Sequence, residues 1–428
     1  MTRRRLLAGA GSARIEWSAD LFPIEGFVGV LDPLEARVVM FDDGGGARVA
    51  VAVIDQTSVS DRFAVLLRSV VAEECVLAPE DVVVVASHTF SAPHVMDDDP
   101  SGDGGRNAEL RDALMGALRA AARSAAAGLD PATVAVSAGV CDVNVNRDVL
   151  TDAGYWLGAN ESGTSDKSVT SIIVRRDDGQ VVAVLVSYGV QPSVLADSYV
   201  PGGGRLVSAD LAGVAMRHVE SQYPGAVSMF LVGAGGDQAP RFAAVFATVD
   251  RGGAWRARDL GASAQVLVDV QGQRLGDAVV SLVEAAPAGE ASPVIRVVRD
   301  EVVVVSREPL PRERIGPQLE CDWVPAAPVA VPLILVSIGD VALVCVAPEL
   351  TAVTGMDIVA RSAVPSTIVV TMANGAAKYM ADQSSFDRVT YAAQSSRFAP
   401  GSAESVANRL VDLLGVGRRA SGATVGDC

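Results

Sequence analysis

The sequence predicts an α/β fold in which mixed β-sheets with β-hairpins are covered by helices, within a single large domain. Short apolar runs alternate along the chain with segments of helical periodicity, which is typical of α/β proteins. Two pairs of apolar runs are joined by tight turns, at Asp177-Asp178-Gly179 and at Gly339-Asp340, and these indicate hairpins. Because a hairpin pairs its two strands antiparallel, the sheets are expected to be mixed rather than purely parallel.

The elements follow one another in a regular order. A first strand is expected near the N-terminus, and further strands are expected at 37–41, 49–55, 81–87, 133–139, 227–233 and 366–373. Helices are expected at 60–75, 107–128, 209–223, 260–285, 350–363 and 402–416. No repeat and no long linker rich in proline, glycine or serine divides these elements. One domain is therefore predicted over 1–417, followed by a flexible tail over 418–428.

The composition excludes several classes of protein. Half of the residues are hydrophobic, as in a compact globule, and no apolar run reaches the length of a membrane-spanning helix. The formal net charge of −16 gives no basic surface for nucleic acid or for an anionic membrane, so the expected partner is a small molecule. The apolar part of the opening RRRLLAGA is too short for a secretory signal, which predicts a cytoplasmic protein. The sequence leaves the oligomeric state open.

Polar side chains gather where the predicted strands end. The loop after 81–87 reads SHTFSAPH and holds His88 and His94, two of the three histidines in the chain. The other strand-end segments carry further residues able to bind or react, namely Asn146, Arg147, Gln191, Asp237, Glu349, Tyr379 and Tyr391. Open α/β sheets bind ligands beyond the carboxyl ends of their strands, so these side chains are expected to converge around one cavity.

The order of these segments resembles the N-terminal catalytic domain of the neutral, non-lysosomal ceramidases and of shorter bacterial proteins that share it. The family motifs T-H-T-H-S-G-P, N-R, H-P, G-D-x-S-P, P-G-E and a tyrosine-rich segment have counterparts here in the same order, and the resemblance spans Leu6 to Leu414. It implies zinc-assisted amide hydrolysis, in which two histidines, a glutamate and a tyrosine hold the metal and a bound water attacks the acyl carbonyl.

Three positions depart from the family pattern. His88, Glu349 and Tyr379 match the implied zinc ligands, but Gln191 stands where the family has its second zinc histidine. A neutral amide oxygen is a poor zinc donor beside an imidazole, so a set of His88, Gln191, Glu349 and Tyr379 is expected to hold zinc weakly if a metal is retained. Phe90 replaces the other loop histidine, and Ala239 replaces the serine of G-D-x-S-P. Hydrolysis of ceramide by the family route is therefore not expected.

The first of three hypotheses is an enzyme that acts on an amide or acyl bond of a small soluble metabolite, by hydrolysis or by the reverse bond formation, with a weakly bound metal or with none. Arg147 would bind a carboxylate through its planar fork, while His88 or His94 would transfer protons. Tyr379 or Tyr391 would donate to a developing oxyanion. Further contacts to the substrate are expected from Asn146, Gln191, Asp237 and Phe90.

Two other hypotheses stay open. In one, His94 or Asp97 fills the gap left at Gln191 and completes a metal centre. In the other, the chain is a catalytically silent homologue that binds a ligand or a partner. Some residues also have simpler explanations, because His94 can lie in a solvated loop before the acidic run that begins at Asp97, and Asp237 can serve only to hold its loop through backbone hydrogen bonds.

Overall fold

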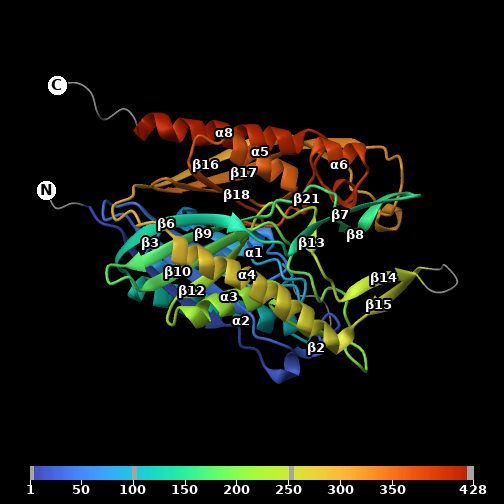
Figure 1. The fold of residues 1–428 in the computed structure, drawn as a ribbon, viewed down its shortest axis with the longest axis horizontal. Coiled ribbons are helices and arrows are strands. Elements are labelled where there is room, and N and C mark those ends of the chain that lie inside the picture. Colours follow the sequence, from blue (N-terminus) through green and yellow to red (C-terminus); the bar gives the residue numbers. More distant parts are fainter. Residues whose placement is uncertain (1–3, 99–103, 250–254, 422–428) are drawn as a thin grey trace.

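The structure, a computed structural model, describes residues 4–98, 104–249 and 255–421. The chain forms four layers, in which two sheets pack face to face and each carries helices on its outer face (Figure 1). The predicted fold class, mixed sheets with hairpins under a cover of helices in one domain, is confirmed. No helix in the described ranges is both long enough and apolar enough to cross a bilayer.

The larger sheet has eight strands. Their spatial order is β12 (Val227–Val232), β10 (Val181–Tyr188), β9 (Ser168–Arg176), β6 (Asp130–Val140), β1 (Leu7–Arg14), β3 (Glu35–Asp42), β4 (Arg48–Ile54) and β5 (Val82–Ala86). The pairs β4–β5 and β10–β12 are parallel and the remaining pairs are antiparallel. The mixed sheet follows from the hairpin at β9–β10, which turns at the predicted Asp177-Asp178-Gly179.

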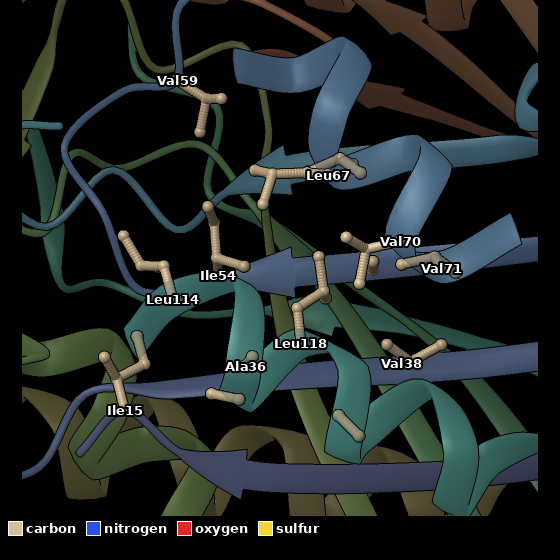
Figure 2. Packing of buried hydrophobic residues seen from close by; sticks show 14 of the residues in the cluster. Ile15, Ala36, Val38, Ile54, Val59, Leu67, Val70, Val71, Leu114 and Leu118 are labelled. Carbon is tan, nitrogen blue, oxygen red and sulfur yellow. The ribbon is translucent and has the colours of Figure 1, made fainter. Parts of the chain in front are cut away.

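Both faces of this sheet are buried, which explains why its strands are continuous apolar runs. In β3, Val38 points toward the helices and its neighbour Val39 points toward the second sheet. Figure 2 shows the helix side, where Leu67 of α1 (Asp61–Cys75) and Leu118 of α2 (Arg106–Ala127) pack over the strands. The other half of the same face is covered by α3 (Asp210–Gln222) and α4 (Gln265–Ala285).

Close packing of α2 on β1 depends on glycine. A Cβ at Gly9 would lie 2.1 Å from the carbonyl oxygen of Ala125, and one at Gly11 would lie 2.3 Å from that of Ala121. Both distances are far shorter than van der Waals contact, so any side chain at these positions would push the helix off the sheet.

The N-terminus of the neighbouring α1 is capped by Ser60, whose hydroxyl accepts a hydrogen bond from the backbone N–H of Phe63.

The second sheet has the order β16 (Ile295–Arg307), β17 (Pro325–Ile338), β18 (Val341–Val346) and β20 (Ser366–Val370). The β17–β18 hairpin turns at the predicted Gly339-Asp340, whereas β18 and β20 are parallel. One face packs on the larger sheet through residues such as Val336 and Leu343, and the other is covered by α5 (Ala352–Arg361) and α8 (Ser402–Ser421).

Short elements complete the chain around the edges of the two sheets. They are β2 (Phe27–Val30), β7 (Asn144–Thr151), β8 (Gly154–Asn160), β11 (Arg205–Val207), β13 (Gln238–Pro240), β14 (Val245–Val249), β15 (Trp255–Asp259), β19 (Glu349–Leu350), β21 (Tyr379–Met380), α6 (Gln383–Asp387) and α7 (Tyr391–Ser395). The structure pairs β13 with β7 and β19 with β21, and these two pairs carry much of the candidate site.

Two sequence-based expectations need correction. Asn144 to Arg147 do not follow a strand but begin one, because they pair with β13 and open the β7–β8 hairpin. The tail predicted from Arg418 is also too long, since α8 continues to Ser421. Residues 418–420 are two arginines and an alanine, which favour helix, so the helical hydrogen bonds continue through them. The rest of the predicted tail, 422–428, lies outside the described residues.

Candidate functional site

Most of the predicted site residues come together where strands of both sheets end. Backbone hydrogen bonds join the loops: the N–H of Phe90 donates to the carbonyl of Pro192 at 3.0 Å, and the N–H of Gly236 donates to that of Leu350 at 2.8 Å. Because these bonds link segments from both sheets, the loops form one rigid frame. Five predicted side chains meet inside it, and each exposes at most 8% of its surface: His88, Arg147, Gln191, Glu349 and Tyr379.

His88 lies just beyond β5 in the left-handed region, with φ of 64°, which turns its ring inward. Its Nδ1 contacts the carbonyl oxygen of Thr57, an atom that can only accept, so Nδ1 carries a hydrogen. Its Nε2 lies 3.1 Å from Oε2 of Glu349. Burial alone would lower the pKa of His88, but the Glu349 carboxylate raises it above the ordinary value for histidine. The imidazole, once protonated, is therefore close enough to the Glu349 carboxylate to form an ion pair.

Gln191 occupies the centre of the cluster and links its other members. Its Nε2 donates to Oε2 of Glu349 at 2.5 Å and, more weakly, to the Tyr379 hydroxyl at 3.4 Å. Its Oε1 accepts a hydrogen bond of 2.8 Å from Nη1 of Arg147. Reversing the amide would place its NH₂ group against the guanidinium N–H, donor against donor, so this network fixes the orientation of the side chain.

Arg147 is a buried cation held by neutral groups. Besides Gln191, it donates from Nη2 to the carbonyl oxygen of Gly236 at 2.6 Å, while its Nε has no partner in the described part of the chain. Its guanidinium lies over two rings, 4.9 Å from the centroid of Tyr379 and 5.4 Å from that of Tyr391. Although burial would lower the pKa of Arg147, the nearby Tyr379 and Glu349 raise it, so the side chain stays charged.

Asn146 and Asp237 lie behind Arg147 and fix its strand. The Asp237 carboxylate accepts hydrogen bonds from Nδ2 of Asn146 at 3.1 Å and from the backbone N–H of Ala352, at the start of α5, at 2.8 Å. The Asp237 carbonyl also accepts from the N–H of Arg147. These bonds favour the simpler of the two explanations for Asp237, that it holds its loop in place, and they tie the Arg147 strand to the second sheet.

Tyr391 and Phe90 border the cluster with aromatic surface. The Tyr391 ring stacks edge to face with Tyr379 at 5.8 Å between centroids, and with Trp156 of β8 at 5.7 Å. Phe90 makes a similar contact with the His88 ring at 4.9 Å. All three outer rings are partly exposed, so they lie between the buried polar groups and solvent.

His94 does not join the other predicted residues. Its side chain is half exposed, and its Nδ1 contacts a carboxylate oxygen of Glu25 at 2.8 Å. Asp97 is also directed elsewhere, because it accepts a hydrogen bond from the Ser60 hydroxyl at the start of α1. Neither residue fills the place of a missing metal ligand beside Gln191.

Several residues of the site were not anticipated from the sequence. Thr57 contacts His88 through its backbone carbonyl, which any residue could supply. Its identity in the sequence therefore does not mark it as part of the site. Trp156 reaches Tyr391 from a hairpin whose strands were not predicted. Asp148 was overlooked although it directly follows Arg147. Alternation along β7 directs it away from Arg147, and there it is 99% buried, with Oδ2 3.7 Å from Nη2 of Arg388.

Asp148 makes stability depend on pH. Burial, and then the charge of Asp237, raises the pKa of Asp148 to about 6. Because this folded value exceeds the unfolded one, the folded state binds more protons between about pH 4 and 6, and stability falls as the pH rises through that window. The Asp148→Asn variant cannot titrate, so its free energy of unfolding relative to wild type is expected to increase by about 3 kcal/mol between pH 4 and pH 8. Urea denaturation at both pH values measures this change.

The matched control for Asp148→Asn is Asp20→Asn, which changes a carboxylate that is exposed near the N-terminus. Its stability relative to wild type should stay constant between the same two pH values. If Asp148→Asn were equally insensitive to pH, the Asp148 carboxyl would have no raised pKa in the folded protein.

The zinc set implied by the sequence resemblance is brought together but does not fit a metal. His88, Glu349 and Tyr379 offer lone pairs, whereas Gln191 presents an NH₂ group, which has none to donate to a cation. The Gln191 oxygen that could bind a metal is held by Arg147 instead. Across residues 4–98, 104–249 and 255–421, no group of three or more histidine, cysteine, aspartate or glutamate side chains is placed to hold an ion.

Comparisons with known proteins support the fold. No protein-family model matches the chain, and no curated protein matches its sequence. Two solved structures, a neutral ceramidase from Pseudomonas aeruginosa and a ceramidase complexed with C2, each align with a TM-score of 0.74 at 15% identity. The alignments cover 98% of this chain, and 75% and 76% of the respective ceramidase chains. Over nearly its whole length, therefore, this chain has a ceramidase-like fold.

Proposed function

We propose that this chain catalyses hydrolysis, or the reverse condensation, at an amide or other acyl bond of a small soluble metabolite, by acid–base catalysis without a zinc ion. The observation that carries the proposal is the buried His88–Glu349 pair beside the Arg147 cation. The ceramidase-like fold supports acyl chemistry by analogy, since ceramidases cleave an amide bond. The formal net charge of −16 disfavours binding to an anionic membrane and so supports a soluble substrate.

His88 is the proton carrier in this mechanism. In the hydrolytic direction its Nε2 takes a proton from water as the water oxygen bonds to the acyl carbon. The same Nε2 then delivers the proton to the leaving nitrogen as the carbon–nitrogen bond breaks. The Thr57 carbonyl fixes the tautomer by holding the hydrogen on Nδ1, and Glu349 stabilises the imidazolium that forms.

Arg147 and Tyr379 are suited to stabilise the negative charge that develops on the carbonyl oxygen. The substrate oxygen would replace Oε1 of Gln191 on the guanidinium, and the Tyr379 hydroxyl would donate its proton to the same oxygen. Low exposure makes these interactions stronger, because little water screens them. The rings of Phe90 and Tyr391 would contact the apolar part of the substrate.

Removing the proton carrier is expected to slow turnover strongly while leaving the fold intact. The test is a panel of N-acyl amino compounds assayed with and without a chelator, on protein purified without chelator and analysed for metal. The His88→Gln variant should lose about 10²- to 10⁴-fold in kcat, the typical contribution of a general acid or base. In wild type, kcat/KM should rise with pH along a limb centred above about 6.5, because the pKa of His88 is raised and the neutral ring is the active base.

The control for His88→Gln is His94→Gln, which removes an imidazole outside the cluster and should leave kcat unchanged. Activity that disappears with chelator and returns with zinc would contradict the zinc-free mechanism. Activity that persists in His88→Gln would contradict the assigned role of His88.

A catalytically silent protein that binds a ligand is the second candidate. It is favoured by the internal hydrogen bonding of the cluster, in which Gln191 connects Arg147, Glu349 and Tyr379 in one network. This candidate predicts that compounds of the same panel bind, and that none is converted by wild-type protein at any pH. Metal-free protein with measurable binding and no product would decide in its favour.

A further inference from the structure

A large cavity is lined in part by Pro348 and Lys378, the residues that directly precede β19 and β21. It has a volume of about 720 Å³, within the range of small-molecule sites, and residues of β16, of β17 and of 394–398 line it. Its wall is mainly apolar, with contributions from Leu310, Ile315, Val331, Ile334, Pro348 and Phe398. None of the five buried side chains of the His88 cluster lines it. The two sites are thus separate.

The charges around this cavity are unusual for so acidic a chain. Three cations line it, Arg307, Lys378 and Arg397, against the single carboxylate of Asp61. None of the three cations forms an ion pair with any residue of the described ranges. Since the whole chain carries a net charge of −16, three uncompensated cations around one hollow are not expected from composition.

Arg307 strengthens this observation because it is buried. Only 3% of its surface is exposed, and its guanidinium donates to backbone carbonyls, among them that of Ala393 at 2.8 Å. Its Nε has no hydrogen-bond partner in the described part of the chain. The guanidinium carbon lies 4.9 Å from the centroid of the Trp323 ring. Burial lowers the pKa of Arg307, as expected for a cation without a counter-charge. A buried charge of this kind is costly unless something of opposite sign approaches it.

We propose that this cavity binds an amphipathic organic anion, with its apolar body against β17 and its anionic group near Arg307, Lys378 and Arg397. The volume suits a body of drug-like size, and the apolar wall would gain from its burial. The two exposed cations, Lys378 and Arg397, would steer the anion to the opening, while Arg307 would interact with it inside. This inference does not depend on the chemistry of the His88 cluster.

The test uses a matched pair of fluorescent probes. The anion 8-anilinonaphthalene-1-sulfonate and its uncharged counterpart N-phenyl-1-naphthylamine share an apolar body and differ in the sulfonate. Wild type is expected to bind the anion at least about tenfold more tightly, equivalent to about 1.4 kcal/mol. Decanoate should displace the bound anion, whereas decyltrimethylammonium of the same chain length should not. Equal affinity for the two probes would overturn the proposal, because it would show that the cations contribute nothing.

Variants at exposed positions locate the probe without endangering the fold. The double variant Lys378→Ala/Arg397→Ala should weaken binding of the anion about tenfold, and Ala330→Trp, which fills the cavity from β17, should weaken both probes. The control Arg48→Ala/Arg361→Ala removes two charges outside the cavity and should change neither affinity. Unchanged binding in Ala330→Trp would place the probe elsewhere and refute the site. The His88→Gln variant should bind both probes as wild type does.

Discussion

Replacing Arg147 by methionine is expected to lower the free energy of unfolding by about 2–6 kcal/mol, because two buried acceptors left without a hydrogen bond cost about 1–3 kcal/mol each. Methionine keeps apolar bulk beside Tyr379 and Tyr391 but removes every donor. Oε1 of Gln191 and the carbonyl of Gly236 would lose their hydrogen bonds in a buried setting. Guanidinium chloride denaturation at pH 7, followed by circular dichroism, measures the loss.

Two further substitutions make this prediction specific. Arg147→Lys keeps the charge but lacks the planar fork whose two nitrogens reach Gln191 and Gly236, so its loss of stability should be intermediate. Arg48→Met breaks an ion pair of 2.6 Å with Asp42 whose arginine is 44% exposed, and it should cost no more than about 1 kcal/mol. A loss in Arg147→Met as small as that in Arg48→Met would mean that the Arg147 network does not stabilise the fold.

Replacing Gln191 by histidine is expected to create zinc affinity where the present side chain opposes it. The amide NH₂ would give way to an imidazole nitrogen with a lone pair, completing a set with His88, Glu349 and Tyr379. Mutating a group that only orients a metal ligand typically changes metal affinity about 10- to 100-fold. A ligand contributes more than such a group, so the added imidazole should tighten zinc binding by at least about 100-fold. Competition with a chromophoric chelator would measure both dissociation constants.

The control for Gln191→His is the same substitution combined with His88→Ala, which removes one ligand again and should return the affinity to that of wild type. Zinc that binds wild type as tightly as Gln191→His would contradict the assigned orientation of the amide. It would mean that the Gln191 oxygen leaves Arg147 and turns to the metal.

The parts of the fold that were predictable depend on local signals. The turns at Asp177-Asp178-Gly179 and Gly339-Asp340 lie between apolar runs of strand length, so both hairpins were predicted correctly. By contrast, β16 was missed because charged residues at 299–301 interrupt its apolar run. The segment forms a strand because its backbone hydrogen-bonds to β17, the strand that follows it in the chain. A local sequence pattern does not show which strand will pair with a segment.

The site was predictable as far as side-chain chemistry at strand ends reveals it. His88, Arg147, Gln191, Glu349 and Tyr379 lie together as expected. What could not be predicted is which atoms face each other. The Gln191 amide presents its nitrogen to Glu349 only because Arg147 holds its oxygen, and that depends on three-dimensional packing. His94, only six residues after His88, diverges because its loop leads to Glu25.

The candidate site combines early and late parts of the polypeptide. All eight strands of the larger sheet are complete by Val232, whereas Glu349 and Tyr379 come from the final quarter of the chain. During translation the first layers can assemble while these two residues are still unmade. A nascent or prematurely ended product would then carry His88 without its partner Glu349, so the candidate site would be incomplete in such fragments.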